Sequence, residues 1–311
     1  MNAEQKLSAL RQTMREHNLD AWIIPSADPH LSEYLPEHWQ ARVYFSGFTG
    51  SVGTLVVTAD KAGLWADSRY WEQAAHQLQG SGIELQKVGE VAPYSVEELG
   101  LVAFPNFLYL NTDWLAAELP NGAAAGVAAD MLSLTAKRQL ETAFAAKNIR
   151  LDVSRDIADA VWADRPALPQ ETVFPHDAAF VSETAAAKLA RVRAAMKEQG
   201  AAWHLISSLD DTAWLTNLRG SDVPYNPVFL SYLLIGTDSA TLFVDEAKLN
   251  PASRALLAEA GIATAPYAAV REALAGISDG LLVNPDKTAV AHAWVQSPTS
   301  FKRFTVGAIV C

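Results

Sequence analysis

The sequence is poor in cysteine, in basic charge and in long apolar runs, and each scarcity excludes a class of protein. Cys311, the last residue, is the single cysteine of the chain, so no internal disulfide can form, and we expect a reducing, cytoplasmic location. A net charge of −11 argues against nucleic acid or an anionic membrane as a partner, because both attract basic surfaces. No apolar stretch approaches the roughly 20 residues that cross a bilayer, and the first 20 residues do not form a conventional secretory signal.

The length and composition predict a globular protein with more than one core. The chain has 311 residues, of which 50% are hydrophobic and 19% charged. Since single cores rarely grow beyond about 250–300 residues, the chain is expected to form two domains.

A repeat within the sequence supports this division. "KLSALRQTMREHNLDAWIIPSAD" begins at Lys6, and the similar "KLARVRAAMKEQGAAWHLISSLD" begins at Lys188. In each copy, apolar residues at i, i+3 and i+7 predict an amphipathic helix. Asn18 and Gly200 follow, and both residue types tolerate the left-handed turn that ends a helix. The expected elements are helices 6–17 and 188–199, followed by buried strands 21–24 and 203–206.

Two further segments repeat in the same order. "FSGFTGS" at Phe45 matches "LTNLRGS" at Leu215, and "GTLVVTADKAGLWAD" at Gly53 matches "SYLLIGTDSATLFVD" at Ser231. The longer segments predict hairpins 53–66 and 231–244, each with a polar turn. Helices are then expected to begin near Asp67 and Asp245, with these residues as N-caps. These two helices are expected to include residues 70–78 and 249–258, and a further helix is predicted near 134–145. The remaining predicted strands are 83–88, 124–127 and 281–283.

This order of elements predicts an α/β fold in which each of two similar domains has a mixed β-sheet flanked by helices. The predicted domains are residues 1–165 and 178–311. Between them, residues 166–177 are rich in proline and are expected to form an extended, solvent-facing linker.

The residues alone do not specify a reaction. No HExxH motif is present, and no two of the seven histidines are spaced four apart. His30 and His38 lie near Glu33 and Glu37, which could suggest a metal cluster, but a surface loop with solvated acids is the favoured interpretation. The glycines of "SGFTGSVG" precede a strand, which is the wrong order for a dinucleotide site and favours a tight turn feeding a hairpin.

Five ordered motifs resemble the aminopeptidase P family, relatives of creatinase and prolidase that remove an N-terminal residue preceding proline. The motifs are "IIPSADPHLSEY", "FSGFTGSVGT", "WADSRYWEQA", "VWADRPALP" and "NLRGSDVPYNPVF". The resemblance covers nearly the whole chain, to about residue 300. It implies the long form of the family, in which two similar creatinase/prolidase N-terminal-type domains precede a "pita-bread" catalytic domain.

The same resemblance implies where the chemistry lies. In the family, two divalent metal ions, usually manganese, are held in the third domain by two aspartates, a histidine and two glutamates, and they activate a water. The chain stops at Cys311, where that domain would begin, so none of these ligands can be assigned here. The chain is therefore expected to be an N-terminal two-domain part of a metallo-aminopeptidase, inactive alone and without a metal site, that gates substrate and supports assembly.

The resemblance also leaves alternatives open. The full-length protein is expected to act on peptides with proline at the second position and to form a homodimer, without nucleic-acid or membrane partners. The chain could instead belong to a non-catalytic pita-bread protein that binds peptides or proteins. It could also belong to another member such as prolidase, although the doubled N-terminal domain weighs against this.

Residues present in one copy of the repeat and absent from the other are the better functional candidates. Arg69 corresponds to Ala247, and Arg219 corresponds to Thr49, whereas Asp67 and Asp245 match and are expected to be structural. The resemblance implies that the segment "NLRGSDVPYNP" (217–227) is a loop that the second domain holds against the catalytic domain, beside its cleft. The alternatives are a surface position for Arg69 and a local ion pair of Arg219 with an acid such as Asp222. The candidates for substrate binding or gating are Arg69, Tyr70, Asn217, Arg219, Asp222, Tyr225 and Asn226.

Overall fold

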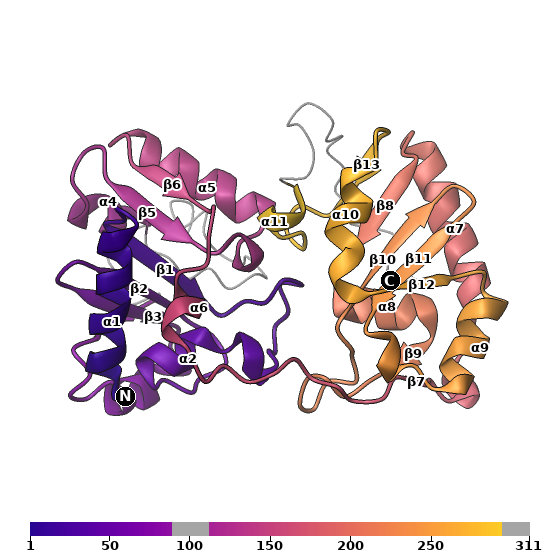
Figure 1. Cartoon of the computed structure of the whole chain (residues 1–311), viewed down its shortest axis with the longest axis horizontal. Helices are drawn as coiled ribbons and strands as arrows, with labels where there is room; N and C mark the ends of the chain where they lie inside the picture. The colour runs from indigo at the N-terminus through magenta and orange to yellow at the C-terminus, as the bar shows by residue number, and fades with distance from the viewer. Residues whose placement is uncertain (89–111, 294–311) are drawn as a thin grey trace. The chain divides into compact units, whose positions relative to one another are not determined.

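The computed structural model describes residues 1–88 and 112–293 and divides the chain into two compact units (Figure 1). Met1–Ala167 is here called domain I, and Leu168–Cys311 domain II. The division falls within the proline-rich segment 166–177. Cys311 lies outside the described residues.

Domain I is built on a six-stranded mixed sheet of order β4-β3-β2-β1-β5-β6. β1 is antiparallel to β2 and parallel to β5, and β2 is antiparallel to β3, which is parallel to β4. Every residue of the four inner strands β3, β2, β1 and β5 is buried, as expected where both faces of a sheet are covered. The strands are β1 Ala21–Pro25, β2 Thr54–Thr58, β3 Ala62–Ala66, β4 Glu84–Lys87, β5 Ala124–Val127 and β6 Arg150–Asp152.

Domain II repeats this topology in a five-stranded sheet of order β12-β11-β10-β8-β13. Each neighbouring pair runs in the same relative direction as its counterpart in domain I. The predicted repeat is therefore confirmed at the level of strand order and direction. The strands are β8 Trp203–Ile206, β10 Ser231–Gly236, β11 Ala240–Val244, β12 Ala263–Ala265 and β13 Leu281–Leu282, with the separate two-stranded ribbon β7 Phe174–Pro175 and β9 Leu218–Arg219.

Both domains contain helices as well as strands, as the amphipathic patterns predict. Those of domain I are α1 Ala3–Glu16, α2 Ala41–Ser46, α3 Trp71–Gln77, α4 Thr112–Glu118, α5 Leu134–Ala145 and α6 Ala158–Val161. Those of domain II are α7 Ala185–Glu198, α8 Leu209–Thr216, α9 Pro251–Glu259, α10 Val270–Ala275 and α11 Val290–Ala293. In the described ranges, no helix combines the length and the hydropathy that crossing a bilayer requires.

The two equivalent long helices, α1 and α7, begin earlier than predicted because polar caps stand upstream of the apolar pattern. Asn2 and Gln5 form a reciprocal capping box at the start of α1, and Thr184 caps α7. After the helices end, Asn18 and Gly200 adopt φ values of 54° and 64°, which confirms the predicted left-handed turns.

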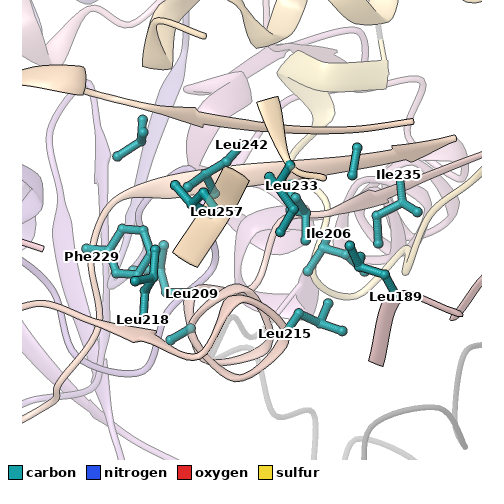
Figure 2. Close-up of a cluster of buried hydrophobic side chains, with 14 of the residues drawn as sticks. Leu189, Ile206, Leu209, Leu215, Leu218, Phe229, Leu233, Ile235, Leu242 and Leu257 are labelled. Atoms are coloured by element: carbon teal, nitrogen blue, oxygen red, sulfur yellow. The ribbon is translucent and has the colours of Figure 1, made fainter. Parts of the chain in front are cut away.

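Each domain has its own apolar core, formed where the long helix packs on the sheet. In domain II the core contains Leu189 of α7 and Leu233 of β10, both with 0% exposed surface. Figure 2 shows Phe229, Leu218 and Leu209 in the same cluster, so the segment between α8 and β10 is anchored in the core at both ends.

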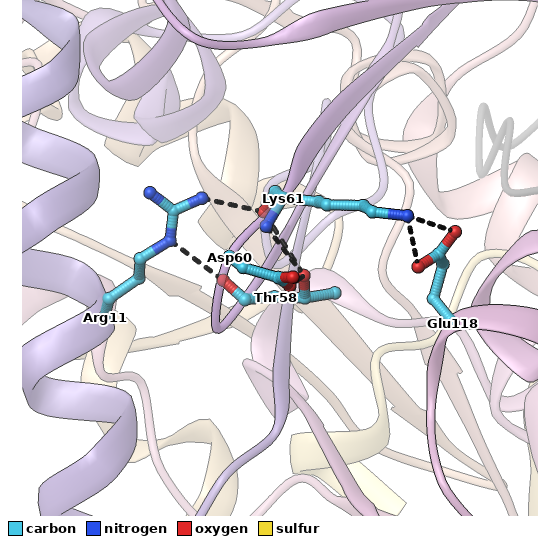
Figure 3. Close-up of polar contacts among 5 residues, drawn as sticks. All are labelled: Arg11, Thr58, Asp60, Lys61 and Glu118. Atoms are coloured by element: carbon cyan, nitrogen blue, oxygen red, sulfur yellow. Dashed lines mark hydrogen bonds and ion pairs between the residues drawn. The ribbon is translucent and has the colours of Figure 1, made fainter.

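An arginine on α1 fixes the turn of the first hairpin (Figure 3). Arg11 donates from Nε to the carbonyl of Thr58 and from Nη2 to the carbonyl of Lys61, each at 2.9 Å. The turn also contains Asp60, which accepts a bond from the Thr58 hydroxyl, while the Lys61 ammonium pairs with Glu118 of α4 at 2.7 Å. The side chains around this turn therefore connect it to two helices.

Domain II repeats the arginine contact at the equivalent positions. Arg193 donates from Nε to Gly236 O and from Nη2 to Ser239 O, each at 3.0 Å. Because this contact occurs in both copies and joins the same elements, it belongs to the scaffold.

Three local predictions need correction. Asp67 accepts the Arg69 N–H in a turn that precedes α3, and Asp245 caps the one-turn 3₁₀ helix Glu246–Lys248, so neither caps the α-helix that follows. The 166–177 segment is not wholly solvent-facing, because Val173 is buried (0% exposed) and bonds to Lys248 O.

The histidine loop is the third correction. Glu33 and Glu37 are exposed as expected, but His30 is only 1% exposed, and His38 is partly buried with its Nδ1 2.5 Å from Pro166 O. The loop therefore presents its acids to solvent while its histidines face the protein.

Candidate functional site

The loop from Asn217 to Leu230 begins where α8 is stopped by a left-handed residue. Asn217 has φ 54° and is buried. Its side-chain Nδ2 donates to Glu183 O at 3.0 Å, and its Oδ1 accepts from the Lys188 ammonium at 2.6 Å. Asn217 thus ties the end of α8 to the start of α7, and its observed contacts are all internal.

Arg219 is the next candidate, and its guanidinium is held by the main chain. Nη1 donates to Ala213 O and to Leu218 O, each at 2.8 Å. The side chain is partly buried, and this burial lowers the pKa of Arg219, an effect that the charge of Asp210 opposes. The alternative that Arg219 pairs with Asp222 is wrong, since Asp222 has a different partner.

Asp222 forms a buried ion pair with Lys248, which lies 26 residues further along the chain. The side chains are 0% and 2% exposed, respectively. Asp222 Oδ2 also accepts the Leu230 N–H at 2.6 Å. Burial raises the pKa of the Asp222 carboxyl, although the Lys248 ammonium and the backbone bond act in the opposite direction. One carboxylate therefore joins both ends of the loop to the segment after β11.

The tip of the loop is exposed. Tyr225 is fully exposed (108%) and adopts φ 63°, a region that costs a non-glycine residue about 1–2 kcal/mol. Pro224 and Pro227 restrict the backbone on either side of the tip. Asn226 closes the turn through its backbone, donating to Val223 O at 3.2 Å and accepting from the Val228 N–H at 2.8 Å. The loop is thus a hydrogen-bonded turn with an exposed aromatic ring at its end.

Glycine is required at the base of this loop. A Cβ on Gly220 would lie 2.7 Å from Phe229 Cβ and 3.0 Å from Val228 O. The absence of a side chain lets the outgoing and returning strands of the loop approach each other, and Gly220 N–H bonds to Pro227 O at 3.3 Å.

Arg69 and Tyr70 belong to domain I and occupy a turn between β3 and α3. The Arg69 guanidinium forms a two-pronged ion pair with Asp67 at 3.0 and 2.8 Å while its side chain stays 63% exposed. Tyr70 OH lies 2.7 Å from Ser51 Oγ, and its ring packs edge-on against Phe48. Their part in substrate gating stays a prediction.

Sequence reasoning missed three buried cations that organise these loops. Arg42, 4% exposed, donates to Ser26 Oγ at 2.7 Å and to Phe48 O at 2.8 Å, and burial lowers its pKa to about 10. Lys248 and Lys188 are the other two, at 3% and 5% exposure.

The internal repeat of the sequence could have indicated one of these three cations, Lys188. Lys188 donates to Trp214 O at 2.7 Å and lies 4.0 Å from the centre of the Trp214 ring. Lys6, its counterpart in the repeat, makes the same two contacts with Tyr44, at 2.8 and 3.8 Å. A lysine that recurs at the same place in both copies indicated a structural contact rather than a solvated charge.

Comparison of the two copies of the repeat also shows that the 217–230 loop of domain II contains an insertion. The matched segments are 170 residues apart before the loop and 178 apart after it, so domain II has eight more residues here (178 − 170). The Tyr225 tip lies within this insertion, and domain I has no counterpart of it.

A metal centre is not formed by the part of the chain that the structure describes. Residues 1–88 and 112–293 bring together no group of three or more histidine, cysteine or acidic side chains able to hold a cation. The arrangement has buried cations, anchored loops and an exposed aromatic tip. Its chemistry suits binding and positioning.

Comparison with known proteins identifies the two domains separately. Residues 6–159 and 164–304 each match a family model described as the creatinase/prolidase N-terminal domain. "Probable Xaa-Pro aminopeptidase P" of Neurospora crassa is 38% identical over 271 residues, 86% of this chain and 37% of that protein. "Aminopeptidase P2" of Arabidopsis thaliana is 36% identical over 296 residues, 93% of this chain and 39% of that protein.

A solved structure is similar to this chain over nearly its whole length. The X-prolyl aminopeptidase of Caenorhabditis elegans, described as a cytosolic enzyme with a di-nuclear active site, aligns with a TM-score of 0.86 and 28% identity. The alignment covers 97% of this chain and 50% of that one. The chain spans about two fifths of the length of the curated relatives named above. The topology, the doubled domain and these matches agree, and the chain belongs to the creatinase/prolidase family, of which it carries two successive N-terminal-type domains.

Proposed function

We propose that this chain is the N-terminal two-domain part of a metal-dependent Xaa-Pro aminopeptidase and that it gates substrate and supports assembly. The observation that carries the proposal is the match of nearly the whole chain to proteins named Xaa-Pro aminopeptidase P, at 36–38% identity for the two relatives above. In this proposal, the full-length protein removes the residue that precedes a proline at the second position of a peptide.

The metal ions of the reaction are assigned to residues outside the described part of this chain. The described residues hold no suitable ligand group, so they do not fit a resident metal. A pair of divalent ions, manganese in our proposal, would activate a water and polarise the scissile carbonyl. The role left for this chain is to shape the entry to that centre, within a homodimer located in the cytoplasm.

The inserted loop of domain II is suited to such a role. Its base is fixed by the Asp222–Lys248 pair and by buried Phe229, so the loop holds its shape without a partner. At the tip of the loop, the exposed Tyr225 is available to contact a partner or substrate. A preformed wall loses little conformational entropy when it meets a partner or substrate, and this makes it effective in positioning.

The test compares this chain with the full-length gene product, using manganese and an Xaa-Pro-Xaa tripeptide. The full-length protein should release the first residue, and an otherwise identical tripeptide with alanine in place of proline should be cut much more slowly. Residues 1–311 alone should show no turnover and no tight manganese binding by calorimetry. Turnover by pure 1–311 that tracks its concentration would refute the division of labour, and an inactive full-length protein would refute the reaction.

A further inference from the structure

The guanidinium of Arg219 is held at one nitrogen and open at the other two. Nη1 is occupied by the carbonyls of Ala213 and Leu218. Nε and Nη2 have no hydrogen-bond partner among the described residues, and neither is among the buried unpaired atoms, so both reach solvent. These two nitrogens form the edge of arginine that binds a carboxylate through two parallel bonds.

The fixed nitrogen makes the open edge a prepared site. An arginine on a free side chain loses rotamer entropy when it binds an anion, whereas Arg219 is already oriented by two main-chain bonds. Arg193 provides a contrast within the same domain, because its Nε and Nη2 are both occupied by main-chain carbonyls.

Charges of both signs lie around Arg219. Arg219 and Arg191 both act electrostatically on the buried Lys188, so three cations lie close together. Arg191 is paired with Glu183 at 2.8 Å. Asp210 acts on Arg219 through its charge, without an ion pair between them in the described structure.

An exposed aromatic residue lies opposite Arg219 in the β7–β9 ribbon. Phe174 of β7 lies directly opposite Arg219 of β9 in the antiparallel ribbon, and directly opposite residues place their side chains on the same face. Phe174 is 42% exposed, while Leu218, the next residue along β9, is buried and so faces the other way. The ribbon thus places Arg219 and the exposed Phe174 opposite each other, with their side chains on the same face.

We propose that Arg219 and Phe174 form a binding site for a carboxylate carried beside an apolar side chain on a peptide. The open Nε–Nη2 edge receives the carboxylate, and the Phe174 ring receives the apolar side chain. The site stands on the geometry of domain II. It rests on the proposed function only for the source of the carboxylate, either the C-terminus of a peptide or a residue of the full-length protein.

The test observes the Arg219 Nε–Hε signal by NMR in the 1–311 chain, with the Arg193 signal as an internal control. N-acetyl-leucine supplies the carboxylate and the apolar side chain, and N-acetyl-leucinamide supplies the same side chain without the charge. The acid should shift the Arg219 signal and the Phe174 backbone signal together and saturably, while the amide leaves them and Arg193 unchanged. Equal responses to acid and amide, or no response to either, would overturn the proposal.

Variants distinguish binding at Arg219 from a general electrostatic effect of the added acid. Arg219→Gln should weaken acid binding, read from the Phe174 backbone signal, by roughly 10- to 150-fold, the range for a charge-assisted hydrogen bond. Arg219→Lys should restore only part of the affinity, because lysine lacks the two-pronged edge. Asp210→Asn should tighten binding, since it removes an opposing charge. An unaltered affinity of Arg219→Gln for N-acetyl-leucine would contradict the assignment.

The same NMR measurement on the full-length protein distinguishes the two possible sources of the carboxylate. If the Arg219 signal is already shifted and ignores added acid, the carboxylate belongs to the protein itself. If it responds to N-acetyl-leucine as the 1–311 chain does, the site takes a peptide C-terminus. Since the NMR result on 1–311 does not depend on peptidase activity, failure of this site and failure of the proposed reaction are distinguishable.

Discussion

Removing the lysine of the Asp222–Lys248 pair should destabilise domain II more than an ordinary surface change. In Lys248→Met, the Asp222 carboxylate stays buried at 0% exposure and keeps only the Leu230 N–H as a donor. Breaking a buried pair by removing one partner costs about 3–5 kcal/mol, which corresponds to a fall in melting temperature of about 10 °C or more in a unit of this size. Lys197→Met, at an exposed lysine of α7, is the matched control and should change stability by less than about 0.5 kcal/mol.

The pH dependence of this variant has a definite sign. Lys248 and the Leu230 N–H both lower the pKa of Asp222 against the effect of burial, so the removal of Lys248 should raise that pKa further. The folded state then holds a proton that the unfolded state releases, and stability rises as pH falls through the raised pKa toward the ordinary value near 4. The difference between Lys248→Met and wild type should therefore shrink between neutral pH and about pH 4.

The assay must separate the two domains, because two cores can unfold separately. Urea unfolding followed by pulsed hydrogen exchange and mass spectrometry reads the peptides of each domain, with domain I as the internal reference. The double variant Asp222→Asn/Lys248→Met keeps an acceptor for the Leu230 N–H and removes both charges, so it should lose clearly less than the sum of the single variants. Additive losses, or a loss that appears equally in domain I, would contradict the ion-pair argument.

Three further predictions use the same assay. Arg11→Met and Arg193→Met should each lower the stability of their own domain by about 1–2 kcal/mol, because each loses two bonds to a hairpin turn; a loss in the wrong domain would contradict the equivalence of the two contacts. Gly220→Ala should destabilise domain II by about 1–3 kcal/mol, because the new Cβ would overlap Phe229, and unchanged unfolding would count against that close approach. Tyr225→Gly should change stability by no more than about 1 kcal/mol, since relief of the left-handed strain opposes the added freedom of the unfolded chain; a large loss would show that the exposed ring has a contact within the domain.

The sequence predicted the elements whose pattern is set by burial. β5 and α5 have the bounds that the apolar spacing gave, and the hairpins of both domains form where the polar turns were expected. These elements follow from local periodicity. Packing one face of a helix or strand against a core is enough to impose the apolar spacing. The left-handed residues Asn18 and Gly200 were predictable for the same reason, since their type alone permits the backbone that a helix end requires.

Contacts between distant segments were not predictable in this way. Lysines such as Lys248 normally suggest solvent, and its burial depends on a carboxylate 26 residues earlier. Asp67 and Asp245 stand where N-caps usually stand, but a turn and a 3₁₀ helix intervene before α3 and α9. The partners of Arg219 are main-chain carbonyls, which every residue possesses, so no sequence pattern could point to them.

The comparison of the two copies separates what the fold needs from what the chain adds. Tyr70 and Lys248 are 178 residues apart and occupy equivalent positions after the hairpin. In domain I this position is joined to the preceding loop by two hydroxyls, Ser51 and Tyr70, and in domain II by the Asp222–Lys248 pair. The fold therefore requires a bond between these segments but not a charged one. The ion pair is found in the copy that carries eight extra residues, where Asp222 also receives the N–H of the returning strand. The hydroxyl pair of domain I joins two segments, whereas Oδ2 of the buried Asp222 carboxylate accepts from both the Lys248 ammonium and the Leu230 N–H. The carboxylate at this site thus joins the two ends of the insertion to the segment after β11, and the insertion is where a role specific to domain II should be sought.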